Sequence, residues 1–520
     1  VAVVTSAVEG SEEAQAKLAQ GAGVIPYIST VKSEVSSMVH STSDLISAKL
    51  KRAATRDNAL RTVRAMKWNP PAILPALPPI LGLLEETKLK SEPLGTVVDL
   101  CNELTKAGPN GKAVPELVLP VLIDFIGAGA AGKWKVKTQT LGILKEVMRR
   151  MLEPQCCPKQ LGIMMPKVMA AVRGAVGDAR KEVKKEADLF LRYIGQELAV
   201  NPEIRGMSEG IIESILDSAN MDKAAETLSK LGNTTFMNTV DSISFGLIFP
   251  VVTRAMREQT HESKMKGVKV VGAAVNLIAD PEVLDPYVAE LLPLLKECLL
   301  HPTHGISREA AKSFGSLAQG LPVLCAEDLM PWLFEQMASQ ETNEDVSEVE
   351  RRGAAQGLAE VLLARRDLFP YHFYKTIIPR IKSGKTNETK AGALAFIQFI
   401  AHLGPQAFVP HVPRCLQTVL DALNEESEVV TKQATAALKV LIEEYGSAYP
   451  HILLPRVQQS LFFATEEARG FAMQAFFALC EKIAEAMKFG QDFLSMDALT
   501  IYYRHSLLSS IFIARNAEDH

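Results

Sequence analysis

The sequence has few of the features that mark secreted, membrane-spanning or β-rich proteins. Seven cysteines occur in 520 residues and none forms a Cys-x-x-Cys pair, so we expect no disulfide framework and a reducing, cytoplasmic compartment. No run of about 18 uncharged apolar residues is present, and we therefore expect no membrane span. The first residues, VAVVTSAVEG, lack the charged start and apolar core of a signal peptide. Aromatic residues make up only 6% of the chain and β-branched runs are scarce, which argues against a β fold.

A strong charge of one sign is also missing. Basic and acidic residues number 56 and 60, for a net charge of −4, so the whole chain is not a general binder of polyanions, although local basic patches can still form. The content of 47% hydrophobic and 22% charged residues is that of a globular chain rather than a disordered one. Ala, Leu, Glu and Lys dominate the long segments, which favours helix.

A proline recurs within apolar, helix-like stretches such as PYVAELLPLLKECLL (286–300). A proline inside a helix costs about 3 kcal/mol, so its repetition needs a reason. From first to last the prolines span 376 residues in nine steps of about 42, if SEGIIESIL (208–216) marks a unit without the proline. HEAT and armadillo repeats have periods of about 40–47 residues. The prolines are Pro79, Pro120, Pro166, Pro250, Pro293, Pro331, Pro379, Pro413 and Pro455.

The period predicts an all-α fold, a curved and elongated α-solenoid of about twelve HEAT-type helical hairpins. In each hairpin the first helix carries the proline, and the second is rich in Ala and Leu, as where Ala310, Phe314 and Leu317 share one face. A bend at each proline lets successive hairpins stack, and each hairpin buries its apolar faces only against its neighbours. We predict three parts, namely an N-terminal helical or linker segment (1–45), a HEAT array (46–364) and further HEAT units (365–520) that end in mid-repeat.

Motifs that could carry chemistry are weak. GAGAAGKW (127–134) matches a phosphate-binding loop, but Trp134 stands where that loop needs Ser or Thr, and Pro120 argues against a preceding strand. Cys298, His301 and His304 lack a fourth zinc ligand and a regular spacing. No Ser/His/Asp or Cys/His arrangement can be assigned. We therefore expect no enzyme activity, no cofactor and no metal site.

Basic residues gather at one place in the repeat, the turn and the start of the second helix, and would align into a ridge along a solenoid. Two interpretations stay open. The basic side chains of the ridge form ion pairs with acids of neighbouring repeats, or the ridge is a binding surface for phosphates or an acidic partner. In contrast, ETNEDVSEVE (341–350) holds five acids and no base, and we expect a solvated insertion in a turn. The candidate binding residues are Lys133, Lys135, Lys137, Arg180, Lys181, Lys184, Lys185, Lys264, Lys266, Arg308, Lys312, Arg351 and Arg352.

Longer stretches carry a resemblance to a known family. LGNTTFMNTVDSISFGLIFPVVTRAMRE (231–258) and KMKGVKVVGAAVNLIADPEVLDPYVAELLPLLKECL (264–299) resemble the HEAT region shared by fungal translation elongation factor three and the large ribosome-bound translational activator of the amino-acid-starvation kinase. VERRGAAQGLAEVLLA (349–364) is similar to the activator alone. Elongation factor three continues into ATP-binding cassettes, whereas this chain continues as HEAT units. The resemblance covers roughly residues 45–520, is strongest between 225 and 364, and favours the activator family.

This resemblance implies a non-catalytic, cytoplasmic scaffold. Its expected partners are the ribosome (rRNA and ribosomal proteins), an ABC-type ATPase and, through a more C-terminal segment, the starvation-sensing kinase of initiation factor two alpha. Two alternatives stay open. The chain could be the N-terminal HEAT arm of an elongation-factor-three-like ribosomal ATPase, or a generic HEAT adaptor such as a nuclear transport receptor or phosphatase scaffold.

Overall fold

The computed structural model describes residues 118–127, 134–153, 158–217, 220–258, 260–278, 281–340, 344–463 and 465–488, with a few isolated residues before 118. Helices dominate these ranges, and extended backbone pairs there in a single bridge, between Val240 and Ile278. The all-α prediction is confirmed. The predictions for Pro79, for most of the segment 1–45 and for the chain after 488 lie outside the described residues.

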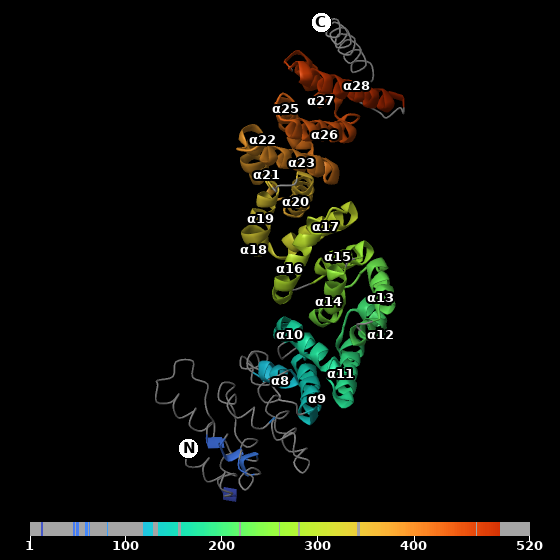
Figure 1. Cartoon of the computed structure of the whole chain (residues 1–520), viewed down its shortest axis with the longest axis vertical. Coiled ribbons are helices and arrows are strands. Elements are labelled where there is room, and N and C mark those ends of the chain that lie inside the picture. Colours follow the sequence, from blue (N-terminus) through green and yellow to red (C-terminus); the bar gives the residue numbers. More distant parts are fainter. Residues whose placement is uncertain are drawn as a thin grey trace. The chain divides into compact units, whose positions relative to one another are not determined.

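Along the described ranges, nine first helices alternate with nine second helices (Figure 1), and the HEAT-type solenoid is confirmed. The first helices are α8 (Leu119–Ile126), α10 (Pro158–Val176), α12 (Pro202–Leu216), α14 (Ser242–Arg257), α16 (Asp285–Leu299), α18 and α19 (Pro322–Leu324, Met330–Gln336), α21 and α22 (Phe369–His372, Ile378–Ser383), α24 and α25 (Pro405–Phe408, Val412–Ala422) and α27 (Pro450–Phe463). The second helices are α9 (Trp134–Met151), α11 (Lys181–Tyr193), α13 (Met221–Asn233), α15 (His261–Val275), α17 (His304–Gly320), α20 (Glu344–Ala364), α23 (Asn387–Leu403), α26 (Glu428–Tyr445) and α28 (Glu466–Lys488).

The recurring proline is placed in the first helix, as predicted, but in two different ways. Helices α10, α14, α16 and α27 each run through their proline. Pro331, Pro379 and Pro413 instead lie in the first turn of α19, α22 and α25, directly after a π-helical or 3₁₀ turn. A proline has no N–H to donate and its ring crowds the carbonyl four residues back, and a change in helical pitch before it relieves both problems.

Contacts divide the chain into two compact units, and unit 1 comprises residues 1–255 and 277–291. The buried ring of Tyr287 packs edge-on against Phe245 and Phe249, with ring centres 4.8 and 4.7 Å apart. The carboxylate of Asp241 accepts hydrogen bonds from the backbone N–H groups of Val200 and Asn201 at 3.2 and 3.1 Å, and it also caps the start of α14. Apolar rings and one carboxylate therefore tie neighbouring hairpins of unit 1 together.

Unit 2 comprises residues 256–276 and 292–520. Its second helices α15, α17, α20, α23, α26 and α28 pack side by side in chain order, and the predicted face of α17 is buried at Ala310, Phe314 and Leu317. Glycines allow close approach to the preceding hairpin: a Cβ at Gly353 or Gly392 would lie 2.3 or 1.9 Å from a backbone carbonyl oxygen. The neighbouring hairpins of unit 2 are therefore locked by backbone contact.

The prediction of a solvated insertion at residues 341–350 is wrong for most of its length. Helix α20 begins at Glu344, and Ser347 in its first turns is fully buried. Acidic side chains in the first turn of a helix interact favourably with its positive end, so this acidic run favours a helix start.

No single helix in the described part of the chain is long and apolar enough to cross a membrane. Residues 387–403 and 405–422 pass that test only as a pair bent by 119°.

Candidate functional site

Helix α9 carries the first of the candidate basic residues, and its cations are held by neighbouring side chains. Lys137 Nζ donates to Asp178 Oδ2 at 2.8 Å, which lowers the pKa of that carboxyl and joins α9 to the turn before α11. Lys135 Nζ lies 5.8 Å from the centre of the Trp134 ring. Lys133 lies outside the described residues. Lys137 therefore fits the interpretation in which a basic side chain pairs with an acid of a neighbouring repeat.

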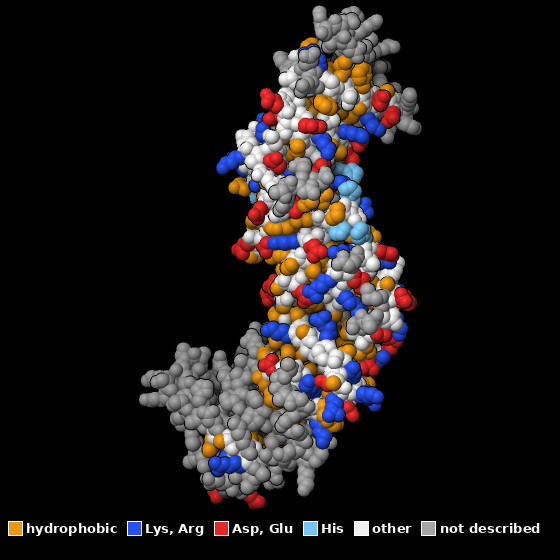
Figure 2. All heavy atoms as spheres, viewed as in Figure 1, with side chains coloured by type: hydrophobic (Ala, Val, Ile, Leu, Met, Phe, Trp, Pro, Cys, Tyr) orange, Lys and Arg blue, Asp and Glu red, His pale blue; other side chains and the backbone are white. Residues whose placement is uncertain are grey.

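The start of α11 differs, because its cations are free. The apolar face of this helix is buried at Val183, Ala187, Phe190 and Leu191, which turns the opposite face to solvent. The basic side chains on that face make no hydrogen bond or ion pair with any described residue. Between residues 134 and 193 the sequence holds 13 Lys and Arg against six Asp and Glu, a local excess in a nearly neutral chain, and Figure 2 shows basic side chains gathering over α9 and α11. The exposed, unpaired cations are Arg180, Lys181, Lys184 and Lys185.

Some candidates in unit 2 are buried. Lys264 is only 7% exposed, and its Nζ pairs with Glu297 of α16 at 2.9 Å. Arg351 is 3% exposed and donates to the carbonyl oxygen of Ser339 at 3.0 Å. These two side chains stabilise contacts between elements and cannot present their charge to a large ligand.

The remaining candidates in unit 2 lie at the surface with local partners. Lys266 pairs with Glu262 one turn earlier in α15 at 2.5 Å. Arg308 and Lys312 share the carboxylate of Glu309, at 3.6 and 2.9 Å. Arg352 Nη1 lies 2.8 Å from His304 Nε2. The structure therefore brings together one group of unpaired basic side chains, at the start of α11. The other described candidates each contact a different neighbouring group.

One cation of this region was not among the candidates. Lys145 Nζ lies 4.2 Å from the centre of the Tyr193 ring and so joins α9 to the end of α11. Its sequence signal is weak, because a lysine in mid-helix and an aromatic residue 48 positions later share no motif. Arg149 and Arg150 beside it are both paired with Glu146, at 2.6 and 3.2 Å.

The weak chemical motifs occupy structural positions. GAGAAGKW joins two α-helices, because Gly127 follows α8 and Trp134 opens α9. Cys298 is 1% exposed, and burial raises the pKa of its thiol to about 11. Within the described ranges, no group of three or more His, Cys, Asp or Glu side chains could hold a metal ion.

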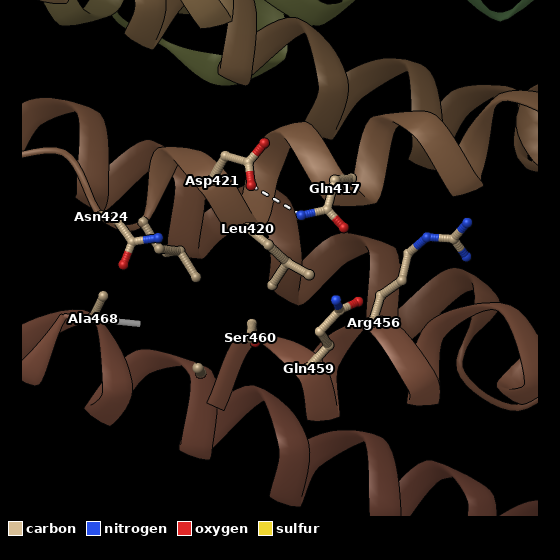
Figure 3. Close-up of a pocket in the computed structure, with 10 residues that line it drawn as sticks. Gln417, Leu420, Asp421, Asn424, Arg456, Gln459, Ser460 and Ala468 are labelled. Carbon is tan, nitrogen blue, oxygen red and sulfur yellow. Dashed lines mark hydrogen bonds between the residues drawn. The ribbon is translucent and has the colours of Figure 1, made fainter. Parts of the chain in front are cut away.

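A hollow of about 180 Å³ lies between α25, α27 and α28 (Figure 3). Gln417 Nε2 donates to Asp421 Oδ1 at 2.9 Å on one wall, and Gln459 and Ser460 lie across from them. Arg456 Nη1 donates to the carbonyl oxygen of Ile452 in its own helix, at 3.1 Å. Ser460 Oγ donates to the carbonyl oxygen of Val457 at 2.7 Å, and the Asp421 carboxylate accepts from Gln417, so the hydroxyl and the carboxylate are not paired as nucleophile and base.

Two family models match the chain. The model described as "Elongation factor 3/GNC1 HEAT repeat" matches residues 222–320, which confirms the resemblance of 231–258 and 264–299. The model described as "Stalled ribosome sensor GCN1-like, HEAT repeats" matches residues 323–480. This second match extends well beyond residue 364, where we expected the strongest similarity to end.

Curated relatives agree with these models. Protein ILITYHIA of Arabidopsis thaliana is 31% identical over 342 residues, 64% of this chain and 12% of the relative. Human "Stalled ribosome sensor GCN1" is 28% identical over 352 residues, 67% of this chain and 12% of the relative. The "eIF-2-alpha kinase activator GCN1" of Saccharomyces cerevisiae is 26% identical over 418 residues, 78% of this chain and 14% of the relative. The chain thus spans 12–14% of the length of these relatives. It is a GCN1-like HEAT-repeat region that includes the elongation factor 3/GNC1 HEAT domain.

Proposed function

We propose that this chain is a non-catalytic, ribosome-binding part of a cytoplasmic HEAT scaffold. The scaffold works with an ABC-type ATPase and, through a more C-terminal segment, activates the starvation-sensing kinase of initiation factor two alpha. The names of the relatives, a stalled-ribosome sensor and an eIF-2-alpha kinase activator, support this function. The part of the chain that the structure describes offers stacked hairpins and no group of three or more His, Cys, Asp or Glu side chains that could hold a metal ion, which suits a scaffold.

The observation that carries ribosome binding is the free basic face at the start of α11. Arg180, Lys181, Lys184 and Lys185 are exposed and unpaired, so they reach a ligand without first breaking an ion pair. Lysines that bind rRNA phosphates displace the counterions held by those phosphates. The affinity therefore falls as the salt concentration rises. Acidic segments of ribosomal proteins would meet the same face. The buried Lys264 and Arg351 take no part in this contact.

An elongation-factor-three-like ATPase arm is the second candidate, favoured by the family match at residues 222–320. The GCN1-like match at 323–480 favours the scaffold instead. Sequencing the next few hundred codons of the gene separates the two, since ATP-binding cassettes follow in one case and more HEAT units in the other.

Pelleting with purified ribosomes tests the basic face. The triple variant K181E/K184E/K185E is compared with a control triple, K223E/K230E/K439E, whose lysines are as exposed but lie near acids. We expect the first triple to lose most binding at low salt, and the slope of log affinity against log salt to fall by about 2–3. Equal pelleting of both triples at low salt would refute the role of α11.

A further inference from the structure

Two adjoining hollows open in the layer of second helices of unit 2. One, of about 260 Å³, lies between the start of α17 and α20, where His301 and His304 form part of its wall. The other, of about 210 Å³, lies over α23 between α20 and α26. Glu348 and Arg352 of α20 line both hollows, and the two adjoining hollows together are here called the α20 groove. Figure 2 shows histidine side chains gathering at one edge of this unit.

The second hollow has an apolar floor and polar walls. Its floor contains the small side chains of Ala391 and Ala395 and the ring of Phe399, all from α23. Above this floor, Gln398 Nε2 donates to Gln433 Oε1 at 2.8 Å, which places two amides at the wall. These groups suit an extended peptide, whose backbone needs amide partners and whose side chains need apolar contact.

Long side chains from α20 and α26 meet across α23. Lys432 Nζ lies 3.1 Å from Glu348 Oε2, although the two residues are 84 positions, or two repeats, apart. Both side chains keep access to solvent, at 64% and 39% exposure, so this bridge is weak and open to competition from another carboxylate.

The α20 groove holds more positive than negative charge. Arg352 and Lys432 line it with exposed charges, Arg351 is buried in its wall, and Glu348 is the one acid among its described lining residues. Arg352 is exposed to solvent on part of its surface. The surrounding protein removes part of the water around its guanidinium, and this desolvation lowers the pKa of the group. Its guanidinium lies in hydrogen-bond range of a histidine nitrogen rather than of a carboxylate. A partly desolvated guanidinium in such a position favours an incoming anion.

We propose that the α20 groove binds an extended peptide segment of a partner protein, in which an acidic side chain neighbours an apolar one. The carboxylate pairs with Arg352, the apolar side chain covers Ala395 and Phe399, and the amides of Gln398 and Gln433 bond the peptide backbone. The apolar floor and the carboxylate of Glu348 favour a peptide over a nucleic-acid backbone. This surface lies in unit 2 and is independent of the basic face of α11.

Fluorescence anisotropy tests this proposal with a fluorescein-labelled ten-residue peptide of alternating Glu and Leu. Arg352→Ala should weaken binding about tenfold or more, because it removes a charge-assisted pair. Arg308→Ala is the matched control, since Arg308 is 63% exposed and lines neither hollow. Glu348→Gln should strengthen binding several-fold by removing the competing acid. These opposite signs cannot both come from a loss of folding.

Three results would overturn the proposal. The first is absence of binding by the wild-type chain. The second is equal affinity for a control peptide in which Gln replaces each Glu. The third is a labelled oligouridylate that binds more tightly than the peptide and depends on Arg352 in the same way, because the groove would then be a nucleic-acid site.

Discussion

Gly392 offers a direct test of how the hairpins of unit 2 are locked together. A Cβ at this position would lie 1.9 Å from the carbonyl oxygen of Met337, 2.9 Å from its carbonyl carbon and 3.3 Å from its Cα. Ordinary contacts of this kind begin at about 3.4 Å. The obstacle is backbone at the end of α19, which cannot rotate away as a flexible side chain would. Gly392→Ala must therefore push α23 and α19 apart by more than an ångström.

The expected cost follows from two opposing effects. Overpacking a tight contact costs about 1–3 kcal/mol, and a rigid backbone obstacle places this site at the upper end. Alanine in a helix interior recovers about 1 kcal/mol relative to glycine. The net result is a loss of about 2 kcal/mol in the free energy of unfolding. Gly470 in α28 is the matched control: it is exposed, a Cβ added there would meet no atom within 4 Å, and Gly470→Ala should stabilise by about 0.5–1 kcal/mol.

Urea unfolding followed by circular dichroism compares the midpoints of the two variants with the parent. Hydrogen exchange measured by mass spectrometry shows where protection is lost, and we expect faster exchange in α19 and α23 of the Gly392 variant. A Gly392→Ala protein as stable as the parent, with unchanged exchange, would refute the close backbone contact.

Two further predictions concern single polar contacts. Tyr445→Phe removes a buried hydroxyl that lies 3.0 Å from the carbonyl oxygen of Pro405. It should cost about 1 kcal/mol in urea unfolding, and an unchanged midpoint would contradict this. The hydrogen bond from Lys137 lowers the pKa of Asp178, so its stabilisation is present above the unfolded pKa of about 3.9 and lost as pH falls through the lowered native value. Asp178→Asn should lower thermal stability at pH 7 but have little effect near pH 2, and an equal loss at both would argue against this linkage.

The repeat could be predicted from the sequence because it is a one-dimensional signal. Prolines at a period of about 42 residues mark the first helices, and this period can be recognised independently of the residues around each proline. The structure adds what this period cannot show, which is how each proline is accommodated. Pro293 lies within a continuous helix, whereas Pro331 follows a π-helical turn. That choice depends on packing around each helix, and local sequence does not encode it.

The candidate surface was harder to predict, because the partner of a charge in a solenoid lies on the next hairpin. Lys264 and Lys184 occupy similar places in their repeats, yet Lys264 is buried against Glu297, 33 residues away, while Lys184 stays free. Register between hairpins decides such pairs, and the sequence pattern does not reveal it. The start of α20 is hard to predict for a related reason, since a run of acids is typical both of a solvated turn and of the first turn of a helix.

Sucrose-gradient sedimentation of the chain with purified ribosomes at low salt tests the proposed ribosome-binding role most directly. The proposal predicts that the chain migrates with the ribosomal peak, that the K181E/K184E/K185E variant leaves that peak, and that raising the salt releases the parent chain. A parent chain that remains at the top of the gradient at low salt, with intact ribosomes below it, would contradict it.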